Sequence, residues 1–325
     1  MIVVTGGAGF IGSNLVRSLN DRGEDDIVVV DDLSNSVKIR NLRDCRFADY
    51  VDMDDFQAEK HGLDGPRAVF HQGACSNTME PDGRYMMKVN YDYSKDLMHY
   101  CLERDVPFIY ASSASVYGAG TVFAEHPSNE SALNVYAFSK LLFDRYARRF
   151  IPGAASQIVG LRYFNVYGPG ESHKSGMASV AWHFSSQYRD RGQVRLFEGS
   201  AGYGNGEQER DFVWVKDVAD VNLHFMDHPD VSGVFNVGTG VSRSFNDVAL
   251  AVINAHEDAD FTLAQALDTG KIEYIPFPEG LREKYQSYTR ADIGTLRSAG
   301  YEAPFLDVEE GVGEYISRLM ADDGV

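Results

Sequence analysis

The first twenty residues have the pattern of a buried strand, a glycine turn and a helix. Residues 1–5 (Met-Ile-Val-Val-Thr) form an apolar, β-branched run typical of a buried strand, and residues 13–20 follow as an amphipathic helix. Between them, Gly6 allows a tight turn, Gly9 lets the backbone approach a pyrophosphate, and Gly12 lets helix and strand pack closely. This order predicts the first unit of a dinucleotide-binding fold, with phosphates at the helix N-terminus.

A second apolar strand, residues 27–30, ends at Asp31, nineteen residues after Gly12. An acidic residue at about this distance is the expected ligand of the cofactor ribose. Asp31 is therefore predicted to bind the cofactor.

Strands and helices alternate along the rest of the N-terminal half. Apolar runs at 68–71, 108–111 and 157–161 are typical of further strands, residues 86–104 and 136–150 of helices, and 235–238 of a late strand. This rhythm predicts an α/β fold, a doubly wound parallel sheet of the Rossmann type with a smaller mixed α/β substrate-binding lobe. We expect a dinucleotide-binding domain over 1–167, to which 211–238 returns, and a substrate lobe over 168–325.

Composition excludes several functional classes. The net charge of −18 argues against a nucleic-acid partner, which needs a basic face. No apolar run reaches about 18 residues, so we expect no membrane span. We also expect no export signal and a cytoplasmic protein. Cys45, Cys75 and Cys101 lack metal-ligand spacing and are expected to be free thiols, and no metal site is predicted.

Tyr136 and Lys140 lie four residues apart in a predicted helix and share one face. A free tyrosine titrates near pH 10, so an acid/base role near neutral pH needs a shift of roughly 3 units, about 4 kcal/mol. We expect the Lys140 ammonium, together with an oxidised nicotinamide, to favour the phenolate and lower the pKa of Tyr136. The motif alone is weak and gains weight from the dinucleotide pattern.

Several motifs together resemble the extended short-chain dehydrogenase/reductase group, most of whose members act on nucleotide-sugars. They are the N-terminal Thr-Gly-Gly-Ala-Gly-Phe-Ile-Gly, Ser113 with Tyr136 and Lys140, Arg-Tyr-Phe-Asn-Val-Tyr-Gly-Pro at 162–169, and Arg-Asp-Phe-Val at 210–213. The segments 86–87, 93–95, 99–104, 173–174, 177–181, 196–200 and 273–278 resemble the ADP-L-glycero-D-manno-heptose 6-epimerase family, which supplies the inner core of lipopolysaccharide.

The resemblance implies an isomerase that inverts C6 of ADP-heptose. Hydride passes from C6 to tightly held NADP, leaves a 6-keto intermediate, and returns to the opposite face. The family motif places two acid/bases at Tyr136 and Lys174, with Lys140 holding the nicotinamide ribose and Ser113 bonding the reacting oxygen. A homo-oligomer, a pentamer in the family, is implied as well.

The remaining contacts are carried over from the family by position. Cofactor contacts are implied for Gly6, Gly9, Phe10, Ile11, Gly12, Asp31, Asp32, Lys38, Gln72, Gly73, Ala74, Cys75, Ser76, Asn90, Lys140, Val166 and Lys174. Contacts to the ADP-sugar are implied for Ser113, Asn165, Ser175, Gly176, His183, Phe197, Glu198, Gly199, Ser200, Arg210 and Tyr285.

Three features depart from the family pattern. The adjacent carboxylates Asp31 and Asp32 favour a free 2′-hydroxyl, hence NAD, although Lys38 could still reach a 2′-phosphate. The usual His-Lys-Gly-Ser order is His-Lys-Ser-Gly at 173–176, and the loop 201–209 is longer than usual.

Alternative functions remain open from the residues. A UDP-hexose 4-epimerase would share Ser113, Tyr136 and Lys140 but would not depend on Lys174. A nucleotide-sugar dehydratase is disfavoured because residues 113–115 (Ser-Ala-Ser) offer no carboxylate. A non-catalytic, dinucleotide-sensing regulator would keep the glycines without needing the acid/base residues.

Overall fold

The computed structural model describes residues 1–59, 65–277 and 286–322. These residues form two compact units, which we describe one at a time. The first unit comprises residues 1–163, 216–237 and 292–302, and the second comprises 164–215, 238–291 and 303–325.

The first unit is built on a parallel sheet, which has seven strands among the described residues. In chain order the strands are β1 (Ile2–Thr5), β2 (Ile27–Asp31), β3 (Asp49–Asp52), β4 (Ala68–His71), β5 (Phe108–Ser113), β6 (Ile158–Tyr163) and β11 (Gly233–Val237). The order across the sheet is β11-β6-β5-β4-β1-β2-β3. The predicted doubly wound Rossmann sheet is confirmed.

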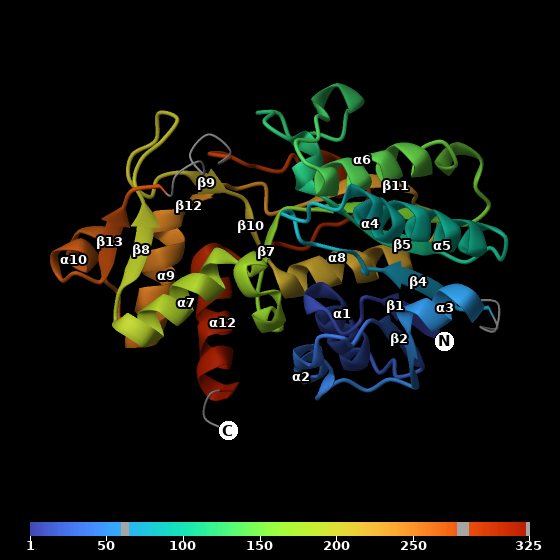
Figure 1. Ribbon diagram of the computed structural model, residues 1–325, viewed down its shortest axis with the longest axis horizontal. Coiled ribbons are helices and arrows are strands. Elements are labelled where there is room, and N and C mark those ends of the chain that lie inside the picture. The colour runs from blue at the N-terminus through green and yellow to red at the C-terminus, as the bar shows by residue number, and fades with distance from the viewer. Residues whose placement is uncertain (60–64, 278–285, 323–325) are drawn as a thin grey trace. The chain divides into compact units, whose positions relative to one another are not determined.

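Helices cover both faces of this sheet (Figure 1). They are α1 (Phe10–Asp21), α2 (Ile39–Leu42), α3 (Met53–Glu59), α4 (Gly83–Met87), α5 (Tyr93–Leu102), α6 (Val135–Ala147), α8 (Val215–Asp227) and α11 (Gly294–Ser298). Strand residues such as Val3, Val28 and Val69 pack with Leu97 of α5 and Phe143 of α6 in one core. Every second residue of each strand points to that face, so continuous apolar runs serve both layers.

The predicted helix over 86–104 is interrupted in the structure. Between α4 and α5 the chain makes a π-helical turn, η3 (Lys88–Asp92). The wide turn contains Asn90, whose side chain bonds to the segment after β4. Such π turns are frequent at functional sites.

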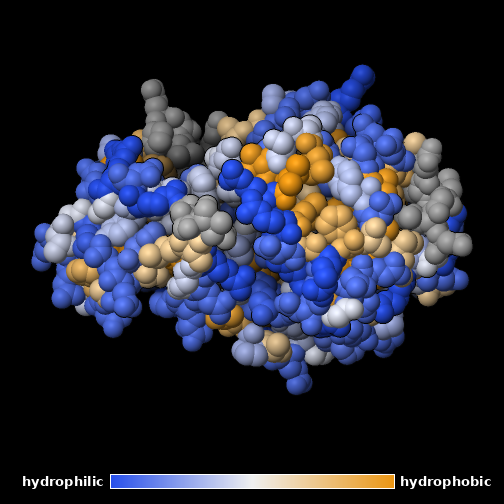
Figure 2. All heavy atoms as spheres, turned by 90° about the horizontal axis from the view of Figure 1, so that it is seen from below, coloured by the Kyte–Doolittle hydropathy of each residue, from blue (hydrophilic) through white to orange (hydrophobic). Residues whose placement is uncertain are grey.

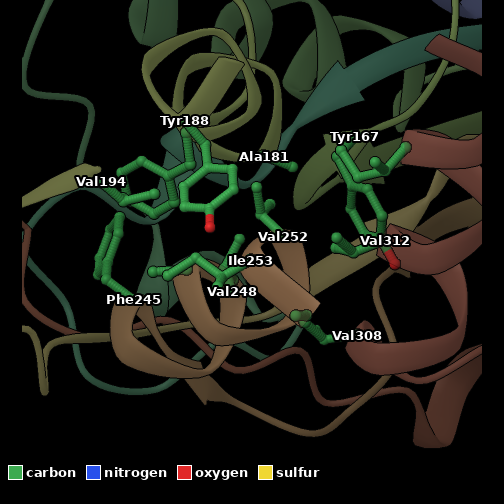
Figure 3. Packing of buried hydrophobic residues seen from close by; sticks show 14 of the residues in the cluster. Tyr167, Ala181, Tyr188, Val194, Phe245, Val248, Val252, Ile253, Val308 and Val312 are labelled. Carbon is green, nitrogen blue, oxygen red and sulfur yellow. The ribbon is translucent and has the colours of Figure 1, made fainter. Parts of the chain in front are cut away.

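The second unit has shorter elements around a separate core. Its strands are β7 (Asn165–Tyr167), β8 (Val194–Phe197), β9 (Glu209–Arg210), β10 (Phe212–Trp214), β12 (Arg243–Ser244) and β13 (Ile272–Ile275), which pair two by two. Its helices are η7 (Ser172–Met177), α7 (Val180–Arg191), α9 (Phe245–Glu257), α10 (Leu263–Asp268) and α12 (Val308–Asp322). Figure 3 shows Tyr188 of α7, Val252 of α9 and Val312 of α12 in this core.

Hydrophilic side chains cover much of the face drawn in Figure 2, with hydrophobic atoms gathered between them. Within the described ranges, none of the helices combines the length and apolar character needed to span a bilayer.

Candidate active site

The strand order of the first unit reverses between β1 and β4, and ligands of such sheets bind beyond the strand ends at that point. The turn after β1 and the segment after β4 meet here. A Cβ on Gly6 would lie 2.5 Å from the nitrogen of Gly73, and Gly6 has a φ of +66°. Only glycine fits this contact and this backbone conformation.

Helix α1 begins directly above this turn. Its N-cap is Gly9, and a Cβ on Gly12 would lie 2.1 Å from the carbonyl oxygen of Gly6. Phe10 is buried, whereas Ile11 is partly buried. The first N–H groups of a helix have no carbonyl partner within it, so this end is suited to a pyrophosphate.

Asp31 ends β2 and is buried beside the glycine turn. Its Oδ2 accepts from the Ala8 N–H at 2.8 Å, and its Oδ1 accepts from the Asp32 N–H at 2.7 Å and from Lys38 Nζ at 2.8 Å. The Asp32 carboxylate instead accepts from Ser34, and these hydrogen bonds lower the pKa of Asp32. Lys38 thus neutralises the charge of Asp31. The Asp32 side chain instead forms its hydrogen bonds within its own loop.

The segment after β4, Gln72 to Ser76, is held by side chains from three elements. Gln72 Nε2 donates to Asn222 of α8 at 3.0 Å, and the Gly73 N–H donates to Thr5 Oγ1 at 3.2 Å. Asn90 accepts from the Cys75 N–H at 2.8 Å and donates to the Cys75 carbonyl at 3.0 Å. The structure therefore brings the predicted cofactor residues of the first unit to one edge of the sheet.

Ser113, Tyr136 and Lys140 also lie at this edge. Asn134 caps α6 by accepting from the Ala137 N–H, which places Tyr136 in the first turn. Tyr136 is hydrogen-bonded to Ser113, the last residue of β5. Lys140 Nζ donates to the Ala111 carbonyl at 2.8 Å.

Burial shifts the pKa values of both Tyr136 and Lys140. Burial raises the pKa of Tyr136, against the hydrogen bond from Ser113. Burial also lowers the pKa of Lys140 to about 8. The expected lowering of the Tyr136 pKa needs an oxidised nicotinamide beside Lys140 and stays a prediction. In the protein chain by itself, desolvation of the phenolate is the largest influence on Tyr136.

Lys174 lies in η7 of the second unit, beside the buried carboxylate of Glu171. Burial lowers the pKa of Lys174, while Glu171 opposes the shift. Glu171 accepts from Ser179 Oγ at 2.7 Å, and burial raises its pKa. Ser175 follows with a φ of +50° and ψ of −125°, a strained conformation for a residue with a Cβ, and Gly176 is exposed.

The other predicted site residues of the second unit lie on β7, on β9, on α7 and at the end of β8. Asn165 and Val166 lie on β7, and Arg210 lies on β9, buried with its guanidinium over the Phe245 ring. His183 lies on α7 with its ring against Trp182. Phe197 ends β8 and stacks on Phe277, and the next residue, Glu198, is exposed. The Gly199 N–H donates to Asn205, and Ser200 is bonded to Gln208. Tyr285 lies outside the described residues.

Three residues that bear on this edge of the first unit were not among the predicted site residues. Thr5 Oγ1 bonds both His71 and the Gly73 N–H, and Gly7 packs so closely that a Cβ there would lie 2.9 Å from Val29. Asp144 lies one turn after Lys140 and is fully buried. Its spacing of four from Lys140 was visible in the sequence, but its partners were not.

No cluster of three or more His, Cys, Asp or Glu side chains suited to a metal ion occurs in the described ranges.

Comparison with family models gives a match to the NAD dependent epimerase/dehydratase family over residues 2–238. This range contains the glycine turn, Ser113, Tyr136, Lys140, Lys174 and Arg210. It covers well over half of the chain.

Two relatives resemble the chain over nearly its whole length. A protein of Alkalilimnicola ehrlichii is 57% identical over 323 residues, covering 98% of this chain and 97% of its own. One of Thiobacillus denitrificans is 56% identical over 325 residues, covering 98% of each. Both are named ADP-L-glycero-D-manno-heptose-6-epimerase.

Solved structures give a consistent picture. The ADP-L-glycero-D-manno-heptose-6-epimerase of Helicobacter pylori has a TM-score of 0.82 and 31% identity, covering 98% of this chain and 96% of its own. The UDP-glucose 4-epimerase of Thermotoga maritima has a TM-score of 0.79 and 26% identity, covering 99% of both chains.

Proposed function

The chain belongs to the NAD dependent epimerase/dehydratase family and, within it, to the ADP-L-glycero-D-manno-heptose-6-epimerases, and from this premise we propose that Tyr136 and Lys174 are its two acid/base groups. It is an isomerase of a nucleotide-sugar that converts ADP-D-glycero-D-manno-heptose to the L-glycero epimer. This activity belongs to the synthesis of the lipopolysaccharide inner core.

We propose NADP as the cofactor, which would accept hydride from C6 of the heptose and return it. The glycine turn, the N-terminus of α1 and the segment 72–76 would hold it. The observation that favours NADP over NAD is the contact of Lys38 Nζ with Asp31 Oδ1 at 2.8 Å. This contact offsets the charge of Asp31 that would repel a 2′-phosphate, and Lys38 would supply an ammonium to bind that phosphate.

Tyr136 is proposed to exchange the proton of the reacting oxygen on one face, with Ser113 bonding that oxygen. Lys140 would bind the nicotinamide ribose and supply the positive charge that lowers the pKa of Tyr136 when the oxidised cofactor adds its own. Because burial raises the pKa of Tyr136 in the protein chain, the phenol is held protonated until these charges act.

Lys174 is proposed to perform the same exchange on the opposite face of the ketone. Its burial lowers its pKa toward the working range of a general acid/base. Asn165, Ser175, Gly176, His183, residues 197–200 and Arg210 are proposed to bind the ADP-sugar, with Arg210 as the cation for its pyrophosphate. A homo-oligomer, pentameric as in the family, and a cytoplasmic location are proposed on the same resemblance.

The deciding experiment is proton NMR of ADP-D-glycero-D-manno-heptose incubated with wild type, Tyr136→Phe, Lys174→Met and, as a control, Lys216→Met at an exposed lysine. We expect epimerisation by wild type and the control, and a fall of roughly 10²–10⁴-fold in both site variants. Turnover of UDP-galactose but not of the heptose would instead identify a UDP-hexose 4-epimerase. Cofactor binding without turnover of either sugar would leave a regulator.

A further inference from the structure

Helix α6 is fastened to β5 along one face. Lys140 Nζ donates to the Ala111 carbonyl at 2.8 Å. Four residues later on the same face, Asp144 accepts from the residues on either side of Ala111: from Tyr110 OH at 3.1 Å and from Ser112 Oγ at 2.9 Å. Three hydrogen bonds thus fix the register of the helix against one strand.

The carboxylate of Asp144 is also paired with a buried arginine. Arg162 Nε on β6 donates to Asp144 Oδ2 at 2.8 Å, and Arg162 Nη2 donates to Glu130 Oε1 at 2.6 Å. All three side chains have 0% exposure. A buried ion pair is often no more stable than apolar residues of the same size, because both charges lose their hydration. A gain in stability therefore does not by itself explain why these three charged side chains are buried here.

The electrostatics of Lys140 supply another reason. Burial disfavours its ammonium and brings its pKa to about 8, while Asp144 on α6 and the Cys75 thiol after β4 oppose that shift. His71 of β4 also faces Lys140, but burial and the lysine charge hold its pKa at about 3, so it is neutral. Of Asp144, Cys75 and His71, Asp144 is the group that carries a carboxylate, the natural partner of an ammonium.

We propose that Asp144, held in place by Arg162, is a positioning residue of the active site that keeps Lys140 as an ammonium and fixes Lys140 and Tyr136 against β5. The inference rests on the proposed roles of Lys140 and Tyr136 in cofactor binding and proton transfer. Asp144 touches neither cofactor nor substrate in this proposal and acts through Lys140.

Competitive acetylation of the full-length protein, read at Lys140 by peptide mass spectrometry across pH 6 to 11, tests the charge. Only the neutral amine reacts, so the pH of half-maximal labelling follows the protonation of Lys140. We expect a midpoint near 8 for wild type and a shift of about one pH unit or more toward acid in Asp144→Asn, because an opposing charge is lost.

Two further variants separate charge from structural damage. Glu130→Gln also breaks an ion pair of Arg162, but on the side away from Asp144, so its midpoint should equal that of wild type. Asp144→Ser removes the same charge with a smaller side chain, so its midpoint should also move toward acid pH. It tests the proposal if Asp144→Asn does not fold. Equal midpoints in wild type, Asp144→Asn and Asp144→Ser would overturn the proposal.

Activity supplies the second readout. The alkaline limb of the pH–rate profile for heptose epimerisation should move to lower pH in Asp144→Asn and return in Asp144→Glu, which restores the charge. An unmoved limb in Asp144→Asn would contradict the proposal. If wild type does not turn over the heptose, the proposed function fails, while the labelling midpoints still decide the role of Asp144.

Discussion

At the residue scale, cofactor choice depends on what surrounds the carboxylate at the end of β2. Asp31 accepts from two backbone N–H groups and from Lys38, so little of its charge is left to repel a phosphate. The neighbouring Asp32 bonds to Ser34. From the sequence, the charge of the two acids favoured NAD while the family resemblance implied NADP. The hydrogen-bond partners of both acids are visible only in the structure.

Replacement of Lys38 by Ala should weaken NADP binding by roughly tenfold or more, about 1.4 kcal/mol, and weaken NAD binding less, since only NADP carries the 2′-phosphate. Replacement of Asp32 by Asn keeps the turn with Ser34 and removes one charge, so it should tighten NADP. Fluorescence titration with NADPH and NADH measures both ratios. Equal losses for the two cofactors in Lys38→Ala would show that Lys38 does not bind the phosphate.

At the element scale, the first turn of α1 depends on glycines without side chains, and the first turn of α6 depends on a capping side chain. Gly9 and Gly12 let α1 begin against the β1 turn, and Asn134 caps α6 so that Tyr136 and Lys140 face β5. The glycine turn and the helix over 136–150, though not its Asn134 cap, were visible in the sequence as local patterns. The π turn before α5 was not, because it depends on contacts of Asn90 with the distant segment around Cys75.

Gly12→Ala should abolish dinucleotide binding and destabilise the fold by about 2 kcal/mol or more, because the added Cβ meets the rigid carbonyl of Gly6 at 2.1 Å. The matched control is Gly313→Ala in α12, where nothing lies within 4 Å of the added Cβ. It should stabilise by about 0.5–1 kcal/mol through helix propensity. Urea unfolding and NADPH titration measure both effects. Normal binding by Gly12→Ala would contradict the close packing.

At the scale of the whole molecule, the chain has two hydrophobic cores and a large negative charge. The units have separate hydrophobic clusters, one under α5 and α6 and one between α7, α9 and α12. The chain returns twice to the first unit after leaving it, at 216–237 and 292–302. The 292–302 return was not predicted, since it is a short segment without a strand pattern.

The net charge of −18 predicts a salt-dependent stability. Self-repulsion between exposed carboxylates destabilises the compact state, and salt screens it over about 10 Å at 0.1 M. The midpoint of thermal unfolding should therefore rise between 0.02 and 0.3 M NaCl. Sucrose of equal osmolality serves as the uncharged control, and an unfolding midpoint that falls with NaCl would show that attractive pairs dominate the surface.

The sequence by itself determined the fold class and the chemistry at the strand ends. Glycine spacing, apolar runs and the Tyr-x-x-x-Lys pair act over a few residues, so they can be recognised without the fold. The tertiary structure decided the environment of each group: the partners of Asp31, the ion pair of Asp144 with Arg162, and the burial that raises the pKa of Tyr136 and lowers that of Lys140. Desolvation and charge pairing arise between residues far apart in the chain, which is why no local pattern could give them.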